Sequence, residues 1–271
     1  MKLSCRLEVL PGKSVLEQIT NAHRFGFDGI GLPGRFLDQY LEDLLEVWKD
    51  LPLPLMSLSL GFKGSLLHPE PSGRRRCQES LVRLMDICVQ LGVKCLNVPP
   101  VLSQDNPVRI TDKGSFPSFE ARLDALLESE LTILADEASA RDLLGLIEPV
   151  NRFESDYLNS IEHGARICRS VARSAIGMTI DTFHMQLEEL DSESAIINAG
   201  SEIKHVHVAE NTRVEPGVGS LDLSAVFRGL QAVGYDDWIE VECRTLSGEA
   251  EKVLPRSVQY LRSTWADPSA S

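Results

Sequence analysis

The sequence predicts an α/β fold, a (β/α)₈ TIM barrel that occupies residues 1–271 as a single domain. Short apolar runs typical of buried strands alternate with amphipathic helical patterns, eight of each, and strict alternation of this kind indicates a parallel sheet. The length of 271 residues also matches such barrels, which form one domain of about 250 residues. The last four apolar runs carry acidic or histidine side chains at their ends, and barrel closure brings the carboxyl ends of all strands to one mouth.

The first half of the chain contains four strand–helix units. Ser14 followed by Glu17 forms a capping box, which predicts the start of the first helix. We expect the segment 61–73 to be a loop over the barrel mouth, and the polar, turn-rich segment 101–118 to be a long functional loop. The predicted strands are 3–10, 29–32, 53–60 and 93–98, and the predicted helices are 14–25, 36–49, 74–91 and 119–140.

The second half repeats the unit four times, and its strands have chemically active groups at their carboxyl ends. Pro149 directly follows Glu148 and ends strand pairing there, because proline cannot donate to the ladder. The predicted strands end at Glu148, Asp181, Val208 and Glu242, and the predicted helices lie at about 160–171, 192–199, 223–234 and 248–264.

Charge and composition narrow the class of protein. With 40 acidic and 27 basic residues the formal charge is -13, which repels nucleic acid and anionic membranes and fits a neutral sugar better. The six cysteines have no CxxC spacing, so we expect free thiols in a reducing compartment. The amino terminus has no signal-peptide core, and no window approaches a membrane span. These features favour a soluble cytoplasmic protein.

We predict that four strand ends share one divalent cation: Glu148, Asp181, His207 and Glu242. Strand side chains alternate, so a ligand at the last inward position points into the barrel mouth. Three carboxylates and one imidazole form an oxygen-rich site for which Mn²⁺ is the expected ion, with Mg²⁺, Co²⁺ and Zn²⁺ as alternatives. Such an ion would chelate a carbonyl and a neighbouring hydroxyl and stabilise an enediolate, while two glutamates supply the acid/base pair.

Further polar residues lie close to these strand ends. His184 follows Asp181 by three positions, on an expected loop, and is predicted to bind substrate rather than metal. His205 and Glu240 each precede a predicted ligand by two positions, so they face the same way one layer deeper. Buried Glu240 needs a partner, for which we predict His205 or a basic group.

The motifs of the second half resemble those of the xylose isomerase-like barrel superfamily, and within it the ketose 3-epimerases of the D-tagatose 3-epimerase type. The resemblance spans the second half in register and the first half loosely. The segments that carry it are 147–154, 180–184, 205–213, 217–222 and 239–242.

The resemblance implies functional roles as well as a fold. The four predicted ligands would hold one Mn²⁺ or similar ion, and Glu148 and Glu242 would double as the catalytic acid and base. Substrate-binding residues would be Glu154, His184 and Arg213, which would contact the ketose near its first two carbons. The substrate would be a sugar or sugar phosphate, and the assembly a homodimer or homotetramer.

Several alternatives stay open from the sequence. Aldose–ketose isomerisation, hydroxypyruvate isomerisation and inosose dehydration all begin, like 3-epimerisation, with loss of a proton beside a metal-bound carbonyl. A nuclease of the endonuclease IV type needs more histidines than the segments 98–100 and 214–217 provide, so it is a remote alternative, as is a non-catalytic metal-binding barrel. His68 is a candidate for lining the pocket, and the arginines 74–76 are expected to be an exposed helix start.

Overall fold

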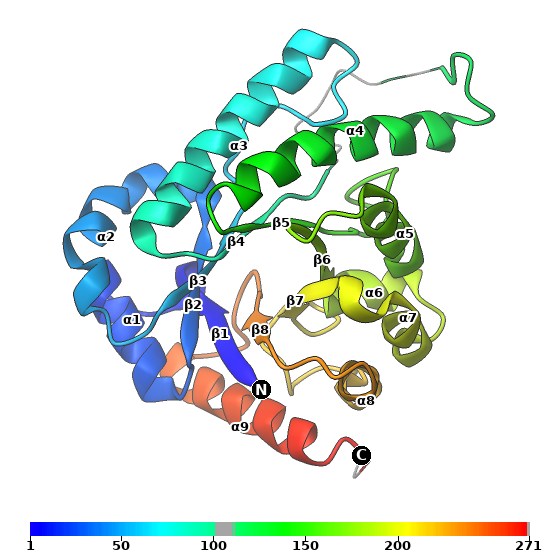
Figure 1. Ribbon diagram of the computed structural model, residues 1–271. Coiled ribbons are helices and arrows are strands. Elements are labelled where there is room, and N and C mark those ends of the chain that lie inside the picture. Colours follow the sequence, from blue (N-terminus) through cyan, green and yellow to red (C-terminus); the bar gives the residue numbers. More distant parts are fainter. Residues whose placement is uncertain (101–109, 111, 270–271) are drawn as a thin grey trace.

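Eight parallel strands close into a barrel in the order of the chain, as predicted. The computed structural model describes residues 1–100, 110 and 112–269, and Figure 1 shows the ring of strands with helices around it. The barrel closes because β1 pairs with β2 on one side and with β8 on the other. The strands are β1 (Lys2–Arg6), β2 (Gly29–Pro33), β3 (Leu55–Ser59), β4 (Cys95–Asn97), β5 (Leu144–Ile147), β6 (Ile176–Asp181), β7 (Ile203–Val208) and β8 (Trp238–Val241).

Helices follow the strands and cover the outside of the barrel (Figure 1). The α-helices of the described residues are α1 (Val15–Phe25), α2 (Leu41–Val47), α3 (Pro71–Leu91), α4 (Phe119–Ser139), α5 (Ile161–Val171), α6 (Thr182–Glu188), α7 (Ser192–Ala199), α8 (Leu223–Ala232) and α9 (Ala250–Ala266). Short 3₁₀ helices lie at η1 (Leu7–Val9), η2 (Gly34–Gln39), η3 (Trp48–Asp50) and η4 (Gly200–Glu202). That residues 1–271 form a single domain stays a prediction.

The structure corrects several predicted boundaries in the first half. The helix expected at 36–49 is broken into η2, α2 and η3, because Tyr40 has φ −138° and ψ 1°, outside the helical region. The third strand begins after Pro54, which has no N–H to donate. Helix α3 begins at Pro71 rather than Arg74, since proline suits the first helical turn. Of the predicted loop 101–118, residues 101–109 and 111 lie outside the described residues.

The two faces of the strands differ in chemistry. Outward-facing residues such as Leu3, Ile30 and Val206 are buried in one apolar core together with residues of the surrounding helices. On the inner face Ser4 and Ser57 both contact Glu240, so polar groups fill the space inside the ring. Barrel interiors are usually packed with branched aliphatic side chains. The polar interior therefore indicates that this part of the barrel supports a site.

Two expectations from composition can be compared with the structure. The six cysteines are free and buried, as predicted. Within the described ranges, no helix is both long enough and apolar enough to cross a bilayer.

Candidate metal and active site

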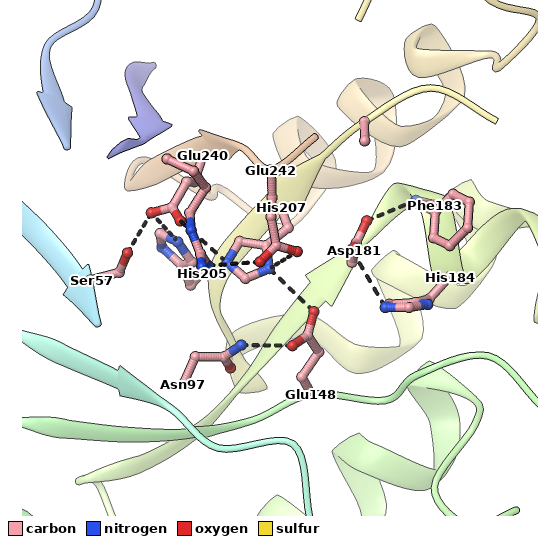
Figure 2. A network of polar contacts seen from close by, with 12 residues as sticks. Ser57, Asn97, Glu148, Asp181, Phe183, His184, His205, His207, Glu240 and Glu242 are labelled. Carbon is pink, nitrogen blue, oxygen red and sulfur yellow. Dashed lines mark hydrogen bonds and ion pairs between the residues drawn. The ribbon is translucent and has the colours of Figure 1, made fainter. Parts of the chain in front are cut away.

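The structure brings the four predicted ligands together at the carboxyl ends of their strands. Glu148 directly follows β5, Asp181 ends β6, His207 lies on β7 and Glu242 directly follows β8. One ligand atom from each of the four lies within 4.8 Å of the others. The His207 Nδ1 atom is 3.2 Å from Glu148 Oε1 and 3.4 Å from Glu242 Oε2, and Figure 2 shows these side chains turned toward one another.

Neighbouring groups orient two of the carboxylates. Asp181 Oδ1 accepts a hydrogen bond of 2.8 Å from the Phe183 N–H and so caps α6. Its other oxygen, Oδ2, is buried and has no hydrogen-bond partner among the described residues. Asn97 at the end of β4 donates from Nδ2 to Glu148 Oε2 at 2.6 Å. Each carboxylate thus has one oxygen held by the protein and one turned toward the cluster.

This donor set fits a divalent cation. Three carboxylates and one imidazole are crowded into a buried space, where like charges repel unless a cation offsets them. Asp181 Oδ2 accepts no hydrogen bond from the described residues, although His184 Nε2 and Arg213 Nη2 lie 3.6 and 3.5 Å away, so it is available as a ligand atom for such an ion. Oxygen-rich sets with one imidazole suit Mn²⁺, Mg²⁺ or Zn²⁺.

The pKa values describe how the cluster shares its charge. Burial works to lower the pKa of His207, but Glu242 and Glu148 outweigh it and raise that pKa well above its usual value. For Glu148 and Glu242 burial favours a higher pKa, yet the charge of His207 lowers both, helped at Glu242 by Arg6. Burial raises the pKa of Asp181 to about 6. The two glutamates thus favour the protonated form of the imidazole, and binding of a metal ion to a histidine competes with its proton.

A second polar layer lies beneath the cluster. Glu240 accepts a hydrogen bond from Ser57 Oγ at 2.5 Å, and its Oε2 is 3.3 Å from His205 Nε2, which confirms the predicted partnership (Figure 2). Its Oε1 is 3.7 Å from His207 Nε2. Burial works to raise the pKa of Glu240, but His205, His207 and Arg6 lower it to about 2. Carboxylates thus lie on both sides of the His207 ring, within hydrogen-bond distance of Nδ1 and at 3.7 Å from Nε2.

The predicted substrate-binding residues line the same cavity, whose volume is about 320 Å³. They are Glu154 after β5, His184 after β6 and Arg213 after β7. Arg213 reaches across the cavity, with Nη1 3.0 Å from Glu154 Oε1 and Nη2 3.1 Å from Glu242 Oε2. Its backbone φ of 60° lies in the left-handed region that non-glycine residues rarely adopt. Strained residues of this kind concentrate at functional sites.

The placement of His184 on a loop is wrong, because the residue lies in the first turns of α6. Asp181 caps that helix, and a seven-residue helix is too short to give a clear periodic pattern. The Asn151 N–H donates to His184 Nδ1 at 3.3 Å, while Nε2 is 3.6 Å from Asp181 Oδ2. His184 therefore presents Nε2 toward the cluster from a rigid support.

Three other candidates lie away from the cavity. His68 is not among the residues that line it, and its Nδ1 accepts a hydrogen bond of 3.0 Å from the Glu70 N–H. Arg74 is partly buried and pairs with Glu130 of α4 at 2.8 Å, whereas Arg75 is exposed as expected. None of these residues contributes to the site.

Sequence reasoning missed Arg6 and Asn97. Arg6 is almost fully buried at the end of β1, and its Nη1 donates to Glu242 Oε1 at 2.7 Å. Asn97 donates a hydrogen bond from Nδ2 to Glu148 Oε2. The sequence did contain a signal for them, because both are polar residues at the carboxyl end of a predicted strand. Closure of the predicted barrel already sets the first strand beside the last, but the register that brings Arg6 to Glu242 comes only from the structure.

A barrel whose strand ends gather carboxylates and an imidazole around a polar cavity defines a class of enzymes that act on small polar molecules. The comparison with known families makes the class specific. The chain belongs to the xylose isomerase-like TIM barrel family, whose sequence profile matches residues 19–264. The resemblance noted in the sequence is thereby confirmed.

Relatives of known activity act on sugars. A ketose 3-epimerase of Arthrobacter globiformis is 33% identical over 277 aligned positions, covering 98% of this chain and 91% of that protein. The 3-dehydro-D-guloside 4-epimerase of Escherichia coli K12 is 24% identical over 263 residues, and the alignment covers 97% of this chain and 100% of that protein. These relatives identify the chain as a sugar isomerase or epimerase.

Solved structures share the fold. A D-psicose 3-epimerase crystallised in the presence of D-fructose superposes with a TM-score of 0.82 at 19% identity, covering 98% of this chain and 99% of that one. The IOLI protein with a bound zinc atom superposes with a TM-score of 0.75 at 20% identity, covering 99% and 98%.

Proposed function

We propose that this chain is a divalent-metal-dependent ketose 3-epimerase. The observation that carries the proposal is the meeting of Glu148, Asp181, His207 and Glu242 at one buried point beside a cavity of about 320 Å³. A cavity of this size suits a monosaccharide-sized ligand. The 33% identical ketose 3-epimerase favours 3-epimerisation over isomerisation or dehydration on the same site.

The four clustered residues would hold the ion, and Mn²⁺ is the one we expect, with Mg²⁺, Co²⁺ and Zn²⁺ as alternatives. The zinc atom bound by a structural neighbour is in keeping with a divalent ion in this fold. When bound, the ion supplies Lewis acidity, which polarises the ketose carbonyl and favours loss of the adjacent proton.

Glu148 and Glu242 would carry the proton at carbon 3. They directly follow β5 and β8, two different strands, and both lie close to His207 Nδ1, at 3.2 and 3.4 Å. In the proposed reaction they face one substrate carbon from opposite sides. One carboxylate takes the C3 proton, and the C–H electron pair moves toward the carbonyl oxygen. The other carboxyl returns a proton to the opposite face, which inverts C3.

Glu154, His184 and Arg213 would orient the sugar for this exchange. Arg213 only donates hydrogen bonds and Glu154 only accepts them when ionised, so together they can bind carbonyl and hydroxyl oxygens in a fixed register. His184 presents Nε2 from α6 at the edge of the cluster. These three residues line the part of the cavity that lies beyond the ends of β5, β6 and β7.

The test is proton exchange in D₂O. The protein is incubated with Mn²⁺ and a panel of ketoses and ketose phosphates, and NMR locates the deuterium. Label at C3 supports epimerisation, whereas label at C1 or C2 shifts the assignment to isomerisation. Absence of label from every substrate contradicts the proposal.

A further inference from the structure

A second hollow adjoins the proposed substrate cavity. This outer groove has a volume of about 430 Å³ and is lined by residues of η1, of the start of α1 and of the segment from η2 to the first turn of α2. It opens to solvent on the side of the barrel where α1 and α2 pack against one another (Figure 1). Three residues line both spaces, namely Glu8, Pro33 and Phe36. A ligand held in the cavity would enter the outer groove by extending past these residues.

The outer groove lies on the side of the barrel opposite the proposed carbonyl-binding residues. Glu154, His184 and Arg213 follow β5, β6 and β7. The strands close in the order of the chain, so β1 and β2 lie across the ring from β5 and β6. A ketose whose carbonyl end lies near these three residues would point its far end toward β1 and β2, and so toward the outer groove.

Hydrogen bonds hold the walls of the outer groove in place. Gln18 of α1 donates from Nε2 to the Leu10 carbonyl at 3.0 Å, which fixes the turn after η1 against α1. Tyr40, at the start of α2, donates from Oη to the Pro33 carbonyl, which fixes its ring beside the end of β2. Small-molecule sites are usually preformed in this way.

The charges around the outer groove nearly cancel. Among its described lining residues, Glu8, Lys13 and Asp43 are charged. Arg6 pairs with Glu8 at 3.1 Å, and Lys13 and Asp43 have opposite signs. The groove therefore favours neither an anion nor a cation, and a neutral polar ligand matches it best.

The outer groove also offers the two kinds of contact that a sugar ring makes. Phe36 is 48% exposed and lies where the cavity meets the groove, so it presents apolar surface that the C–H face of a sugar can cover. Gln39 is exposed in the groove, and its side-chain amide can both donate hydrogen bonds to hydroxyls and accept them.

We propose that the substrate is a ketose that carries a second neutral sugar unit at the end far from its carbonyl, and that the outer groove binds this unit. The inference rests on the proposed function, from which it takes the position of the carbonyl. The cavity of about 320 Å³ suits one monosaccharide, and the groove adds about 430 Å³ that a free ketose does not fill.

A pair of substrates tests the proposal. The ketohexose that exchanges its C3 proton fastest is compared with its derivative that carries a glucosyl unit on O6, the hydroxyl farthest from the carbonyl. We expect kcat/KM for the glucosylated ketose to exceed that for the free ketose by about tenfold or more, chiefly through KM.

Variants of the groove test whether it is the cause of this preference. Gln39→Trp places a bulky ring in the groove and should reduce the ratio of the two kcat/KM values about tenfold, and Asp43→Trp on α2 should do the same. Asp38→Trp adds the same ring at an exposed neighbour of Gln39 that lines neither space, and it should keep the wild-type ratio. Circular dichroism checks that the variants fold.

A binding measurement separates this inference from the proposed function. Calorimetry gives Kd of the metal-free protein for D-fructose and for its 6-O-glucosyl derivative. We expect the glucosyl unit to lower Kd about tenfold in the wild type and in Asp38→Trp, but not in Gln39→Trp. If no ketose exchanges its C3 proton, the proposed function fails, and the calorimetry still decides whether the groove binds a second sugar unit. Equal values for the free and the glucosylated ketose in either measurement overturn the inference, and so does a ratio that both groove variants retain.

Discussion

The two halves of the barrel make different contributions to the cavity. Strands β5 to β8 each deliver a group that can ligate a metal or transfer a proton. Strands β1 to β4 end instead in Arg6, Pro33, Ser59 and Asn97, which line the same cavity. The second half therefore supplies the groups for the proposed chemistry, and the first half completes the cavity around them.

Contacts between the halves connect first-half side chains to the groups of the second half. Arg6 of β1 bonds Glu242, and Asn97 of β4 bonds Glu148, so first-half side chains contact both proposed acid/base groups. Ser57 of β3 likewise bonds Glu240 beneath the cluster. The first half thus sets the position of groups that the second half supplies.

The largest expected effect is on the proton-transferring pair of the second half. Glu148→Gln and Glu242→Gln should each lower the rate of C3 exchange by at least about 10³-fold, because an amide cannot accept the proton. This loss corresponds to about 4 kcal/mol in the activation barrier. Exchange into D₂O followed by NMR measures it, and circular dichroism checks that the variants fold. Glu162→Gln on the exposed face of α5 is the matched control. A variant that exchanges at the wild-type rate removes that glutamate from the acid/base role.

The next effect concerns metal binding, which we expect to stabilise the folded chain. At a Mn²⁺ concentration of 100 times Kd the gain is about 2.7 kcal/mol, which raises Tm by roughly 5–10 °C for a chain of this size. Asp181→Asn removes a ligand charge but keeps a side chain able to cap α6, so it should lose the rise in Tm without unfolding the helix. Asp191→Asn makes the same change at the exposed cap of α7 and should keep the rise. Thermal unfolding with and without Mn²⁺, and after chelation, measures both. A full rise in Asp181→Asn would contradict its role as a ligand.

The sequence was sufficient for the fold and for the cluster in the second half, because both follow from short-range patterns. Periodicity defines each strand, and each predicted ligand lies at or within one residue of the end of its predicted strand, so one rule locates all four. The rest depends on contacts between distant segments. Arg6 and Glu242 are 236 residues apart in the sequence, and the hydrogen bond between them forms because β1 pairs with β8. The short helix α6 was missed because Asp181 is both a strand end and a helix cap.

A smaller effect is expected at Gly31 of β2, where the first half packs against the second. Gly31 faces Glu240 of β8, and a Cβ at this position would overlap the Glu240 carboxylate. Gly31→Ala should therefore cost about 1–3 kcal/mol of unfolding free energy through overpacking. Chemical denaturation measures this loss, and Gly248→Ala, where the nearest atom is Val253 Cγ1 at 3.2 Å, is the control.

A double variant decides whether the overlap is the cause. Glu240→Asp shortens the side chain by one methylene, so Gly31→Ala/Glu240→Asp should be more stable than the sum of the single losses predicts. Additive losses would show that Gly31 acts on the barrel in another way.

The smallest expected effect lies at a contact between the halves outside the barrel, where α4 meets α5. Asp124 of α4 accepts hydrogen bonds of 2.7 Å from Tyr157 Oη and Arg166 Nη1, and His163 Nε2 also lies 2.7 Å from its Oδ1. Burial works to raise the pKa of Asp124, but these partners lower it overall.

Because the folded-state pKa is lowered, the Asp124 carboxylate stabilises the fold above its unfolded pKa of about 3.9, and this contribution is lost as the pH falls through the folded-state value. Asp124→Asn should cost about 1–2 kcal/mol at pH 7. Urea denaturation measures the free energy of unfolding of the variant and of the wild type. The difference between them at pH 5 should equal that at pH 7, and below about pH 4 it should be smaller. A difference that does not change with pH would mean that the shape of the side chain, rather than its charge, holds the two helices together.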